Sequence, residues 1–475
     1  MPPLPKGRWL SPKAKAGGIP FFKDFFVYNY SLRENLKRAD NIRPYFGFFS
    51  KRRLPFLNIL IIDDLLLPES AKADSSEKAL FCRAAEENLK RRIWAAKEFQ
   101  KLGANVLLIR AKLLKTEAPL SFEFSESEGL SQLFVKIPAK QRGSFLRLPE
   151  LFSFGTSLLE NAPGLSGIFE PDIVLSGGIL PFSFLAGEKI SEGSNAVFVT
   201  ELSCLPAETL KHFGFAFGFN PVLRYFKKST AAAFLKSHAV LGFFPEAAKN
   251  FSGAHNLYPM VFPSFPEAEI PSEKEIFLKE KLSSFGEGKT FVLAFCGEIE
   301  EGFSIEELIL SAGTFGDKFA LVFISEGRKK PYFKRFVAER GITNVFFPED
   351  FSKEETPFIL SGADGIFVSE SDFGKGIFPE EGSFWKALGA QKPVIAAAEH
   401  WSDFFRKAGG AIITKPRRRD SITLGIKTLI NMSETDRETL GRANREFFEK
   451  NSAKNFVKET FSLFDNFVKQ KEIKK

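Results

Sequence analysis

The sequence has few of the residues on which metal-dependent and redox chemistry depend. It contains 3 cysteines, 4 histidines and 3 methionines in 475 residues. Cys82, Cys204 and Cys296 are isolated from one another, so no pair has the spacing of a zinc site or of a redox-active CxxC motif. Isolated cysteines are typical of a reducing compartment, where they are core or surface thiols. The sequence therefore predicts no disulfide framework, no metal centre and no bound cofactor.

Long apolar segments are also absent. The longest apolar runs, such as 59–62 and 291–296, have the length of a strand and are much shorter than a membrane span. The chain does not open with a basic segment, an apolar core and a small-residue cleavage site, so no secretory signal is predicted. With 44% hydrophobic and 26% charged residues, the composition is typical of a globular protein. We expect a cytoplasmic protein.

Phenylalanine, by contrast, is abundant, with 57 residues against 6 tyrosines. Aromatic burial must therefore be achieved mostly without hydroxyl groups. A chain of 475 residues is long enough for at least two domains, each with its own core.

Positive charge is concentrated at the amino-terminal end. Residues 1–56 contain 12 Lys and Arg against 3 Asp and Glu, a net charge of +9, which leaves −1 for the rest of a chain whose total is +8. A near-neutral body argues against a nucleic-acid-binding core. In residues 1–53 basic and aromatic residues alternate, which is typical of a segment on an anionic membrane, here the inner face of the cell membrane. A basic arm packed on its own domain is the alternative.

In the first half of the chain, apolar runs alternate with helical patterns. Strands are predicted at 57–62, 104–109, 171–175, 195–200 and 239–243. Helices are predicted at 76–102, 181–188 and 221–237. Residues 176–178, Ser-Gly-Gly, are predicted to form a turn, and 113–154 receives only a weak assignment. Residues 263–271 are rich in proline and acidic residues, as expected of an interdomain linker.

The second half alternates more regularly. Strands are predicted at 290–296, 319–324, 344–347, 365–368, 393–397 and 411–414, with helices between them and three helical segments at the end. Repeated strand–helix units predict a doubly wound parallel sheet that binds ligands at the carboxyl ends of its strands. The predicted fold class is therefore α/β, with two Rossmann-like domains that face an interdomain cleft. The predicted parts are a leader (1–56), two domains (57–270 and 271–455) and a terminal helix (456–475) able to cross back to the first domain.

One stretch, residues 365–398, has the features of a phosphate site. A strand-like run is followed by a loop with glycine and proline, then by a helix that opens at Glu380, Glu381, Gly382 and Ser383, then by another strand. This order directs main-chain N–H groups and the positive end of a helix at a phosphate. An ordinary βαβ unit without a ligand is the alternative.

Within this stretch, residues 385–396 read WKALGAQKPVIA. Short motifs also end earlier strands, with Phe295-Cys296-Gly297, Ile324-Ser325-Glu326-Gly327 and 363–368 in the second half and 61–64, 67–70 and 201–208 in the first. In this order they resemble motifs of family 4 glycosyltransferases of the GT-B fold, over about residues 55–470. The segment 385–396 is similar to the family's LEALACGKPVIA, and residues 61–70 are similar to a donor-side loop that reads DDxxPxPDxDAGS. Residues 201–208 are similar to DLWPES.

The resemblance implies an enzyme that transfers a sugar from a nucleotide–sugar to a glycan, lipid or other acceptor without a metal, usually with retention. The first domain would lie on the acceptor side and the second on the nucleotide–sugar side. Such chemistry requires fixed donors and cations around the leaving diphosphate. The candidate donor-binding residues are Gly297, Arg328, Lys329, Glu380, Glu381, Gly382, Ser383 and Lys386. No catalytic residue is assigned.

Several family positions carry a different residue here. Glu298 and Glu301 stand where the family has an arginine and a lysine, and two anions would repel a diphosphate. Lys386 replaces the ribose-binding glutamate, and no histidine matches the one in the family's first domain. The alternative function is a catalytically degenerate GT-B protein that serves as a binding or scaffolding partner. A nucleotide–sugar epimerase of the same fold is a third hypothesis.

Each basic or aromatic candidate also has a structural interpretation. Lys386 is either a phosphate ligand or a solvated helix charge, and residues 328–330 are either phosphate ligands or an exposed turn. Residues 417–419, three arginines, are predicted to be a surface run, and Trp385 to be a core residue rather than a stacking platform.

Overall fold

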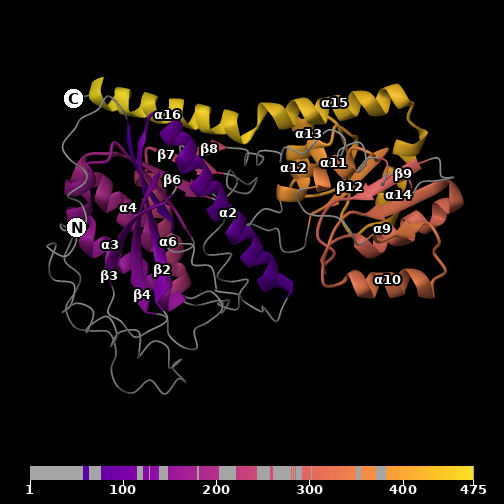
Figure 1. Cartoon of the computed structure of the whole chain (residues 1–475), viewed down its shortest axis with the longest axis horizontal. Coiled ribbons are helices and arrows are strands. Elements are labelled where there is room, and N and C mark those ends of the chain that lie inside the picture. The colour runs from indigo at the N-terminus through magenta and orange to yellow at the C-terminus, as the bar shows by residue number, and fades with distance from the viewer. Residues whose placement is uncertain are drawn as a thin grey trace, which may run out of the picture.

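The structure is a computed structural model of the whole chain. It describes residues 57–63, 76–114, 121–127, 129–138, 148–178, 181–202, 221–242, 257–259, 280, 282, 284, 291–300, 302–348, 355–370 and 381–473. The leader at 1–56 and the linker at 263–271, both predicted from sequence, lie outside these ranges. Two sheets, each covered by helices, make up the described chain (Figure 1).

The first sheet has eight strands in the order β3-β4-β2-β1-β5-β6-β7-β8. All neighbours are parallel except β3 and β4, which form an antiparallel pair at one edge. The strands are β1 (Asn58–Asp63), β2 (Asn105–Leu114), β3 (Ser121–Ser127), β4 (Leu130–Pro138), β5 (Ile173–Gly177), β6 (Val197–Leu202), β7 (Ala239–Gly242) and β8 (Leu257–Pro259).

Alternate residues of β1 show how helices cover both faces of this sheet. Leu60 and Ile62 belong to a cluster with α3 (Leu148–Phe169) and α4 (Pro181–Ser194). Ile59 and Ile61 belong to a cluster with α2 (Ser76–Lys101) and with the last helix of the chain. Side chains in a strand point alternately to its two faces, so a strand covered on both sides is apolar throughout. Helix α6 (Pro221–Lys236) follows β6 and leads to β7.

The second sheet is fully parallel, with six strands in the order β11-β10-β9-β12-β13-β14. Its strands are β9 (Phe291–Phe295), β10 (Phe319–Phe323), β11 (Val345–Phe346), β12 (Gly365–Ser369), β13 (Val394–Ala397) and β14 (Ala411–Thr414). Between them lie α9 (Ile305–Ala312), the 3-10 helix η4 (Gly313–Lys318), α10 (Lys330–Glu339), α11 (Thr356–Leu360), α12 (Glu381–Gly389) and α13 (Ser402–Ala408). The strand order reverses between β9 and β12, which is where open α/β sheets bind ligands.

Three helices end the described chain: α14 (Arg419–Asn431), α15 (Glu434–Lys450) and α16 (Ala453–Ile473). Helix α16 leaves the second sheet and lies along the first, as the yellow ribbon shows in Figure 1. Phe461 and Phe464 of α16 lie 6.2 and 5.8 Å from Phe99 of α2, measured between ring centroids. Near the far end, Lys471 Nζ donates to the main-chain oxygens of Asn195 (2.9 Å) and Ala196 (2.8 Å).

Most elements agree with the sequence-based prediction, including all six strands of the second sheet. The weakly assigned stretch 113–154 contains the β3–β4 hairpin and the start of α3, which the sequence analysis did not predict. The predicted turn at 176–178 is wrong in part, because Ser176 and Gly177 pair with Thr200 and Glu201 as the end of β5. The strand predicted from Asn195 begins at Val197, since Asn195 has a φ of 53° and forms the turn before it.

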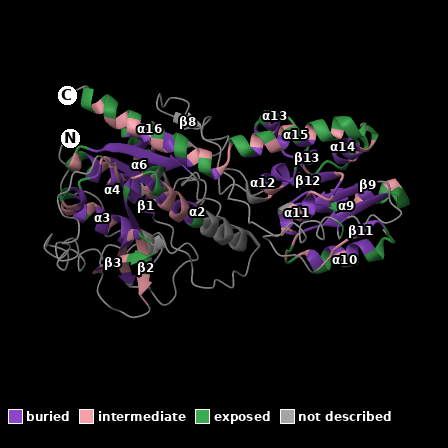
Figure 2. Cartoon of the chain, turned by 45° about the horizontal axis from the view of Figure 1, so that its top comes forward, coloured by how far each residue is buried: buried purple, intermediate pink, exposed green. Residues whose placement is uncertain are grey.

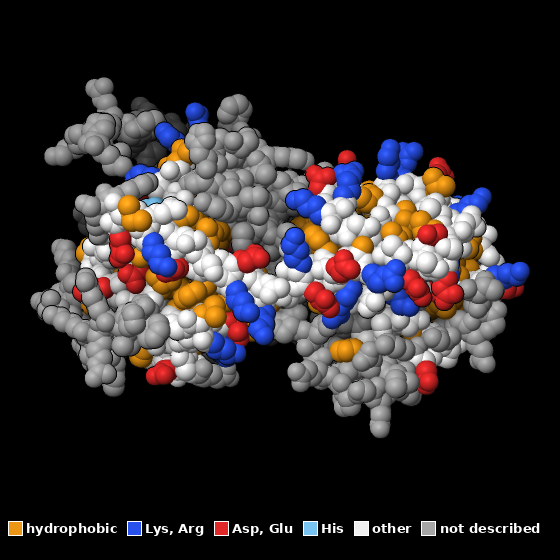
Figure 3. All heavy atoms as spheres, turned by 90° about the horizontal axis from the view of Figure 1, so that it is seen from above, with side chains coloured by type: hydrophobic (Ala, Val, Ile, Leu, Met, Phe, Trp, Pro, Cys, Tyr) orange, Lys and Arg blue, Asp and Glu red, His pale blue; other side chains and the backbone are white. Residues whose placement is uncertain are grey.

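Buried residues gather in the strands and on the inner faces of the helices (Figure 2). On the face seen in Figure 3, acidic and basic side chains are interspersed over both halves rather than gathered into a field of one sign. This distribution agrees with the near-neutral charge calculated for the chain beyond its leader.

Candidate functional site

The carboxyl ends of the parallel strands of the second sheet meet at one edge. We call the residues that follow β9, β10, β12 and β13 there, with the side chains that contact them, the second-sheet edge. Gly297, Ser325, Glu370 and His400 are among them. This edge includes the point where the strand order reverses, between β9 and β12.

The loops after β9 and β10 are joined by main-chain contacts. Gly297 N–H donates to Ser325 Oγ (3.2 Å), and Ile299 N–H donates to the main-chain oxygen of Glu326 (3.1 Å). A Cβ on Gly327 would lie 2.2 Å from the Ile299 carbonyl oxygen, so the two loops are in direct backbone contact. Glycine at position 327 is what permits this approach.

Arg328 is held at this junction by a buried carboxylate. Glu300 Oε1 accepts the main-chain N–H of Arg328 at 3.0 Å and lies 3.7 Å from its Nε. The Glu300 side chain is 1% exposed, whereas that of Arg328 is 47% exposed. The guanidinium is therefore anchored at its base and open to solvent at the second-sheet edge.

The two lysines after Arg328 have different environments. Lys330 is buried, and its Nζ donates to Glu326 Oε1 (2.7 Å) and to the Pro348 oxygen (2.8 Å). It therefore ties α10 to the end of β11. Lys329 lies over the ring of Tyr332, with its Nζ 5.8 Å from the ring centroid.

The start of α12 packs against the end of β9. Cys296 Sγ lies 3.5 Å from the main-chain oxygen of Ser383, within range of a weak S–H hydrogen bond. Complete burial raises the pKa of the Cys296 thiol to about 11, and the nearby charge of Lys386 acts in the opposite direction. Lys386 lies one turn beyond Ser383 on α12, the helix whose start contacts the end of β9.

Trp385 is a core residue, as predicted. Its side chain is 3% exposed and packs edge-on against Phe404 and Phe448 and parallel to Phe447. Its indole Nε1 is buried and has no hydrogen-bond partner in the structure. It therefore does not serve as an exposed stacking platform.

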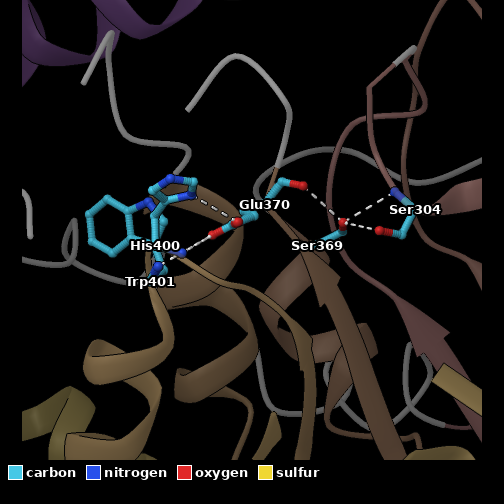
Figure 4. Close-up of polar contacts among 5 residues, drawn as sticks. All are labelled: Ser304, Ser369, Glu370, His400 and Trp401. Carbon is cyan, nitrogen blue, oxygen red and sulfur yellow. Dashed lines mark hydrogen bonds and ion pairs between the residues drawn. The ribbon is translucent and has the colours of Figure 1, made fainter. Parts of the chain in front are cut away.

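Glu370 and His400 form a polar pair at the ends of β12 and β13 (Figure 4). Glu370 Oε1 lies 3.2 Å from His400 Nδ1, and its Oε2 accepts the main-chain N–H groups of His400 (3.0 Å) and Trp401 (3.3 Å). Beside it, Ser369 Oγ accepts the N–H of Ser304 (3.2 Å) and lies 3.0 Å from the Ser304 hydroxyl. These contacts fix the end of β12, the turn after β13 and the beginnings of α9 and α13 relative to one another.

The corresponding edge of the first sheet is built differently. Asp63, Gly177 and Glu201 end β1, β5 and β6, and we call them, with Arg92 of α2, the first-sheet edge. Arg92 Nη1 lies 2.8 Å from Asp63 Oδ1, and its Nη2 lies 3.0 Å from Glu201 Oε1. A Cβ on Gly177 would lie 2.2 Å from Arg92 Nη2, so the guanidinium occupies the space above this glycine.

A second arginine borders this buried group. Arg110 of β2 donates through Nη1 to Gln132 Oε1 (3.2 Å). Burial lowers the pKa of the Arg110 guanidinium, and Asp63 acts in the opposite direction. Two carboxylates and the Arg92 guanidinium are therefore buried at the end of the first sheet, and the half-buried Arg110 lies beside Asp63 on the neighbouring strand.

The structure brings several of the predicted donor-binding residues to one edge. Gly297, Arg328 and Lys329 lie on the loops after β9 and β10, and Ser383 and Lys386 lie on α12. Glu381 and Gly382 belong to the first turn of α12, but their side-chain environment is not described, and Glu380 lies outside the described residues. The sequence analysis did not single out Glu300, Glu370, His400 or Arg92. A usable signal existed for Glu370 and His400, because each closely follows a buried strand of one parallel sheet.

Within the described ranges, no group of three or more His, Cys, Asp or Glu residues is arranged to hold a metal ion. Among the described helices, none combines the length and the apolar content that a membrane span requires.

Comparison with solved structures identifies the architecture. The chain is similar to sucrose-phosphate synthase from Thermosynechococcus elongatus, with a TM-score of 0.57 and 12% identity over 87% of this chain and 100% of that one. It is similar to a glycosyltransferase from Rickettsia africae, with a TM-score of 0.56 and 13% identity over 88% and 100%. It is also similar to an E. coli trehalose-6-phosphate structure bound with UDP-2-fluoro glucose, with a TM-score of 0.53 and 12% identity over 87% and 99%.

These neighbours are GT-B glycosyltransferases, and they cover most of the chain, so the protein has the GT-B fold, as predicted. No protein-family model matches the sequence. The search of curated proteins gave no match either. At this level of identity the likeness extends to the fold, and the activity must be argued from the site.

Proposed function

We propose that the protein is a glycosyltransferase that takes a sugar from a nucleotide–sugar and transfers it to an acceptor without a metal. The observation that carries this proposal is the pair of cations at the second-sheet edge. The anchored Arg328 lies on the loop that contacts the loop after β9, and Lys386 lies on α12, whose start packs against the end of the same strand. A diphosphate that leaves in a sugar transfer needs fixed positive charge where its own charge develops.

These cations compensate for the residues that differ from the family. Glu298 stands where the resemblance places an arginine, but Arg328 approaches the same loop from β10, because Glu300 after β9 holds it there. The similarity to a structure bound with UDP-2-fluoro glucose supports a nucleotide–sugar as the donor. We further propose a glycan or lipid-linked acceptor, reached at the inner face of a membrane through residues 1–53.

Nucleotide binding tests the proposal. Calorimetry of the wild-type protein with UDP, GDP and UDP-sugars should show micromolar binding, and Arg328→Ala and Lys386→Ala should each weaken it about 10- to 100-fold, the range for a charged hydrogen bond. Arg340→Ala is the matched control, because Arg340 lies at the opposite end of α10, against the ring of Phe336. If the folded wild-type protein binds none of these nucleotides, the transferase proposal is wrong.

A second candidate is a GT-B protein that has lost transfer and acts as a binding or scaffolding partner. It is favoured by Glu300, a buried carboxylate that already neutralises part of the charge of Arg328 and accepts a main-chain N–H of the same loop. A ligand phosphate would have to compete with it. Absence of nucleotide binding, together with normal thermal unfolding, would favour this candidate.

Membrane association is a separate part of the proposal. Deletion of residues 1–53 should reduce sedimentation with liposomes that contain anionic lipid, since the basic charge of the chain lies in that segment. Equal sedimentation of the full-length and shortened proteins would contradict a membrane role for the leader.

A further inference from the structure

The pair Glu370–His400 is not used by the proposed donor site described above. Glu370 follows β12 and His400 lies in the turn after β13, and the two strands are neighbours in the sheet. The Glu370 side chain is 7% exposed and that of His400 is 28% exposed. The carboxylate is therefore inside the protein, while part of the imidazole remains accessible at the second-sheet edge. Figure 4 shows the two side chains facing each other.

The carboxylate fixes the imidazole in one orientation. Its Oε2 accepts the main-chain N–H groups of His400 and Trp401, so the turn that carries the ring is bound to the same group as the ring itself. Trp401 is buried and packs edge-on against Phe384 of α12. Because the turn is held in place by packing, the ring could leave Glu370 only by rotating about its own side-chain bonds. That rotation would break the 3.2 Å contact between Nδ1 and Oε1.

The same contact determines which ring nitrogen carries the proton. A carboxylate oxygen can only accept, so Nδ1 must donate to Glu370 Oε1. In the neutral ring Nε2 then has a lone pair, and this nitrogen points away from Glu370 (Figure 4). If Glu370 served only to cap the turn, its contacts with the two main-chain N–H groups would suffice. The additional contact of Oε1 with the imidazole is not required for capping.

His238 provides an internal contrast. It lies in the first half of the chain, and its Nδ1 accepts the main-chain N–H of Phe198 at 3.2 Å. Its neutral ring must therefore carry the proton on Nε2, the opposite tautomer from that of His400. The two rings therefore differ in the group that Nδ1 contacts.

We infer that His400, oriented by Glu370, contacts the sugar of the donor by accepting a hydrogen bond from a sugar hydroxyl at Nε2. This inference rests on the proposed function, because it assumes that a nucleotide–sugar binds at the second-sheet edge. The place of the pair fits the inference, because Glu370 follows β12, which lies next to β9, and the loop after β9 contacts the loop that carries Arg328. Glu370 is a positioning residue, which acts on the sugar only through the tautomer of His400.

The test compares a nucleotide with the corresponding nucleotide–sugar. In calorimetry, His400→Phe should leave the affinity for UDP unchanged and should lower the affinity for the preferred UDP-sugar by about tenfold, the effect of one hydrogen bond. His400→Gln, which retains an acceptor oxygen, should recover part of that loss. His238→Phe should change neither affinity.

Glu370→Gln separates positioning from packing. Its amide can still contact the turn, but its NH₂ group would donate to His400 Nδ1 and move the ring proton to Nε2. The sugar-dependent affinity should then fall by about tenfold while UDP binding is retained. Nitrogen-15 NMR of the imidazoles, feasible with only 4 histidines, should show the Nδ1–H tautomer for His400 in the wild type and the Nε2–H tautomer in Glu370→Gln.

The outcomes distinguish this inference from the proposed function. If the wild type binds neither nucleotides nor nucleotide–sugars, the proposed function fails and the inference fails with it. If nucleotide–sugars bind but His400→Phe and Glu370→Gln lower only the melting temperature, the pair is a turn cap and the inference alone is overturned. An Nε2–H tautomer for His400 in the wild type would overturn it regardless of binding.

Discussion

In both sheets the carboxyl ends of the parallel strands meet at one edge, but the charged side chains at the two edges differ in their exposure to solvent. At the first-sheet edge, Arg92 is 6% exposed and lies between Asp63 and Glu201, which are also buried. At the second-sheet edge, Arg328 is 47% exposed and His400 is 28% exposed, although each is held by a buried glutamate. The charged groups of the first-sheet edge are buried in ion pairs with one another. The second-sheet edge instead exposes a guanidinium and an imidazole, each of which contacts a buried glutamate.

The difference shows how the same sheet architecture can stabilise the fold at one edge and bind a ligand at the other. Buried ion pairs must satisfy one another, because the cost of removing charge from water is repaid only inside a complete network. A half-exposed group on a buried partner keeps its solvation and its freedom to exchange water for a ligand. The first-sheet edge is therefore expected to govern stability, and the second-sheet edge to govern binding.

Removing the arginine from each edge tests this contrast most directly. Arg92→Ala should lower the free energy of unfolding by about 3–5 kcal/mol, since Asp63 and Glu201 would lose the cation that bridges them in the interior. Arg328→Ala should cost about 1 kcal/mol or less, because its half-exposed guanidinium lies 3.7 Å from Glu300 Oε1, which keeps the main-chain N–H of residue 328 as a donor. Urea unfolding of both variants measures the difference, and equal losses would contradict it.

The buried thiol of the second half should give its stability a dependence on alkaline pH. The pKa of Cys296 is raised from 9.0 to about 11, so below pH 9 the thiol is protonated in both states. Between pH 9 and 11 the unfolded chain binds fewer protons than the folded one, and stability should fall with rising pH by up to about 3 kcal/mol. Unfolding of the wild type and Cys296→Ala across this range checks it, because the variant should lack this part of the slope.

Separating the loops of the second-sheet edge should cost less than removing Arg92. In Gly327→Ala the new Cβ would collide with the Ile299 carbonyl, a backbone atom that cannot move alone. We expect a loss of about 1–3 kcal/mol together with weaker UDP binding, because Arg328 would shift with its loop. The control is Gly164→Ala in α3, where a Cβ meets no atom within 4 Å and the change should be neutral or slightly stabilising.

The smallest effect is expected at Trp385. Trp385→Phe removes an indole N–H that is buried without a partner, and it also removes part of a packed ring. The gain from the first change offsets the cavity from the second, so the free energy of unfolding should change by less than about 1 kcal/mol. Phe405→Ala in the same cluster, also fully buried, should cost about 3–5 kcal/mol. A loss of that size in Trp385→Phe would contradict the assignment of its N–H as unpartnered.

The elements of the second half were predictable because each buried strand is an unbroken apolar run. The hairpin β3–β4 was not, because an edge strand such as 121–127 alternates apolar residues with Ser and Glu and lacks such a run. The loop-and-helix pattern of residues 365–398 predicted the start of α12, which contacts the end of β9 through Ser383 and Cys296.

The polar groups that define the two edges were harder to anticipate. Glu370 and His400 are separated by α12 and β13, and Asp63 and Arg92 by much of α2, so no local motif joins them. Their proximity depends on strand order and on the rotation of a helix about its axis, which local residue preferences do not determine. Only the rule that parallel strands end at one edge would have grouped Glu370 with His400.

The return of α16 to the first sheet has a consequence for biosynthesis. Val457 and Phe464 complete the apolar cluster that covers one face of β1 and β2, but they are translated long after those strands. While the ribosome makes the second half, that face is covered by α2 alone, and the rest of it is open to chaperones or to misassociation with other nascent chains. The first half can therefore acquire its final stability only after α16 has emerged.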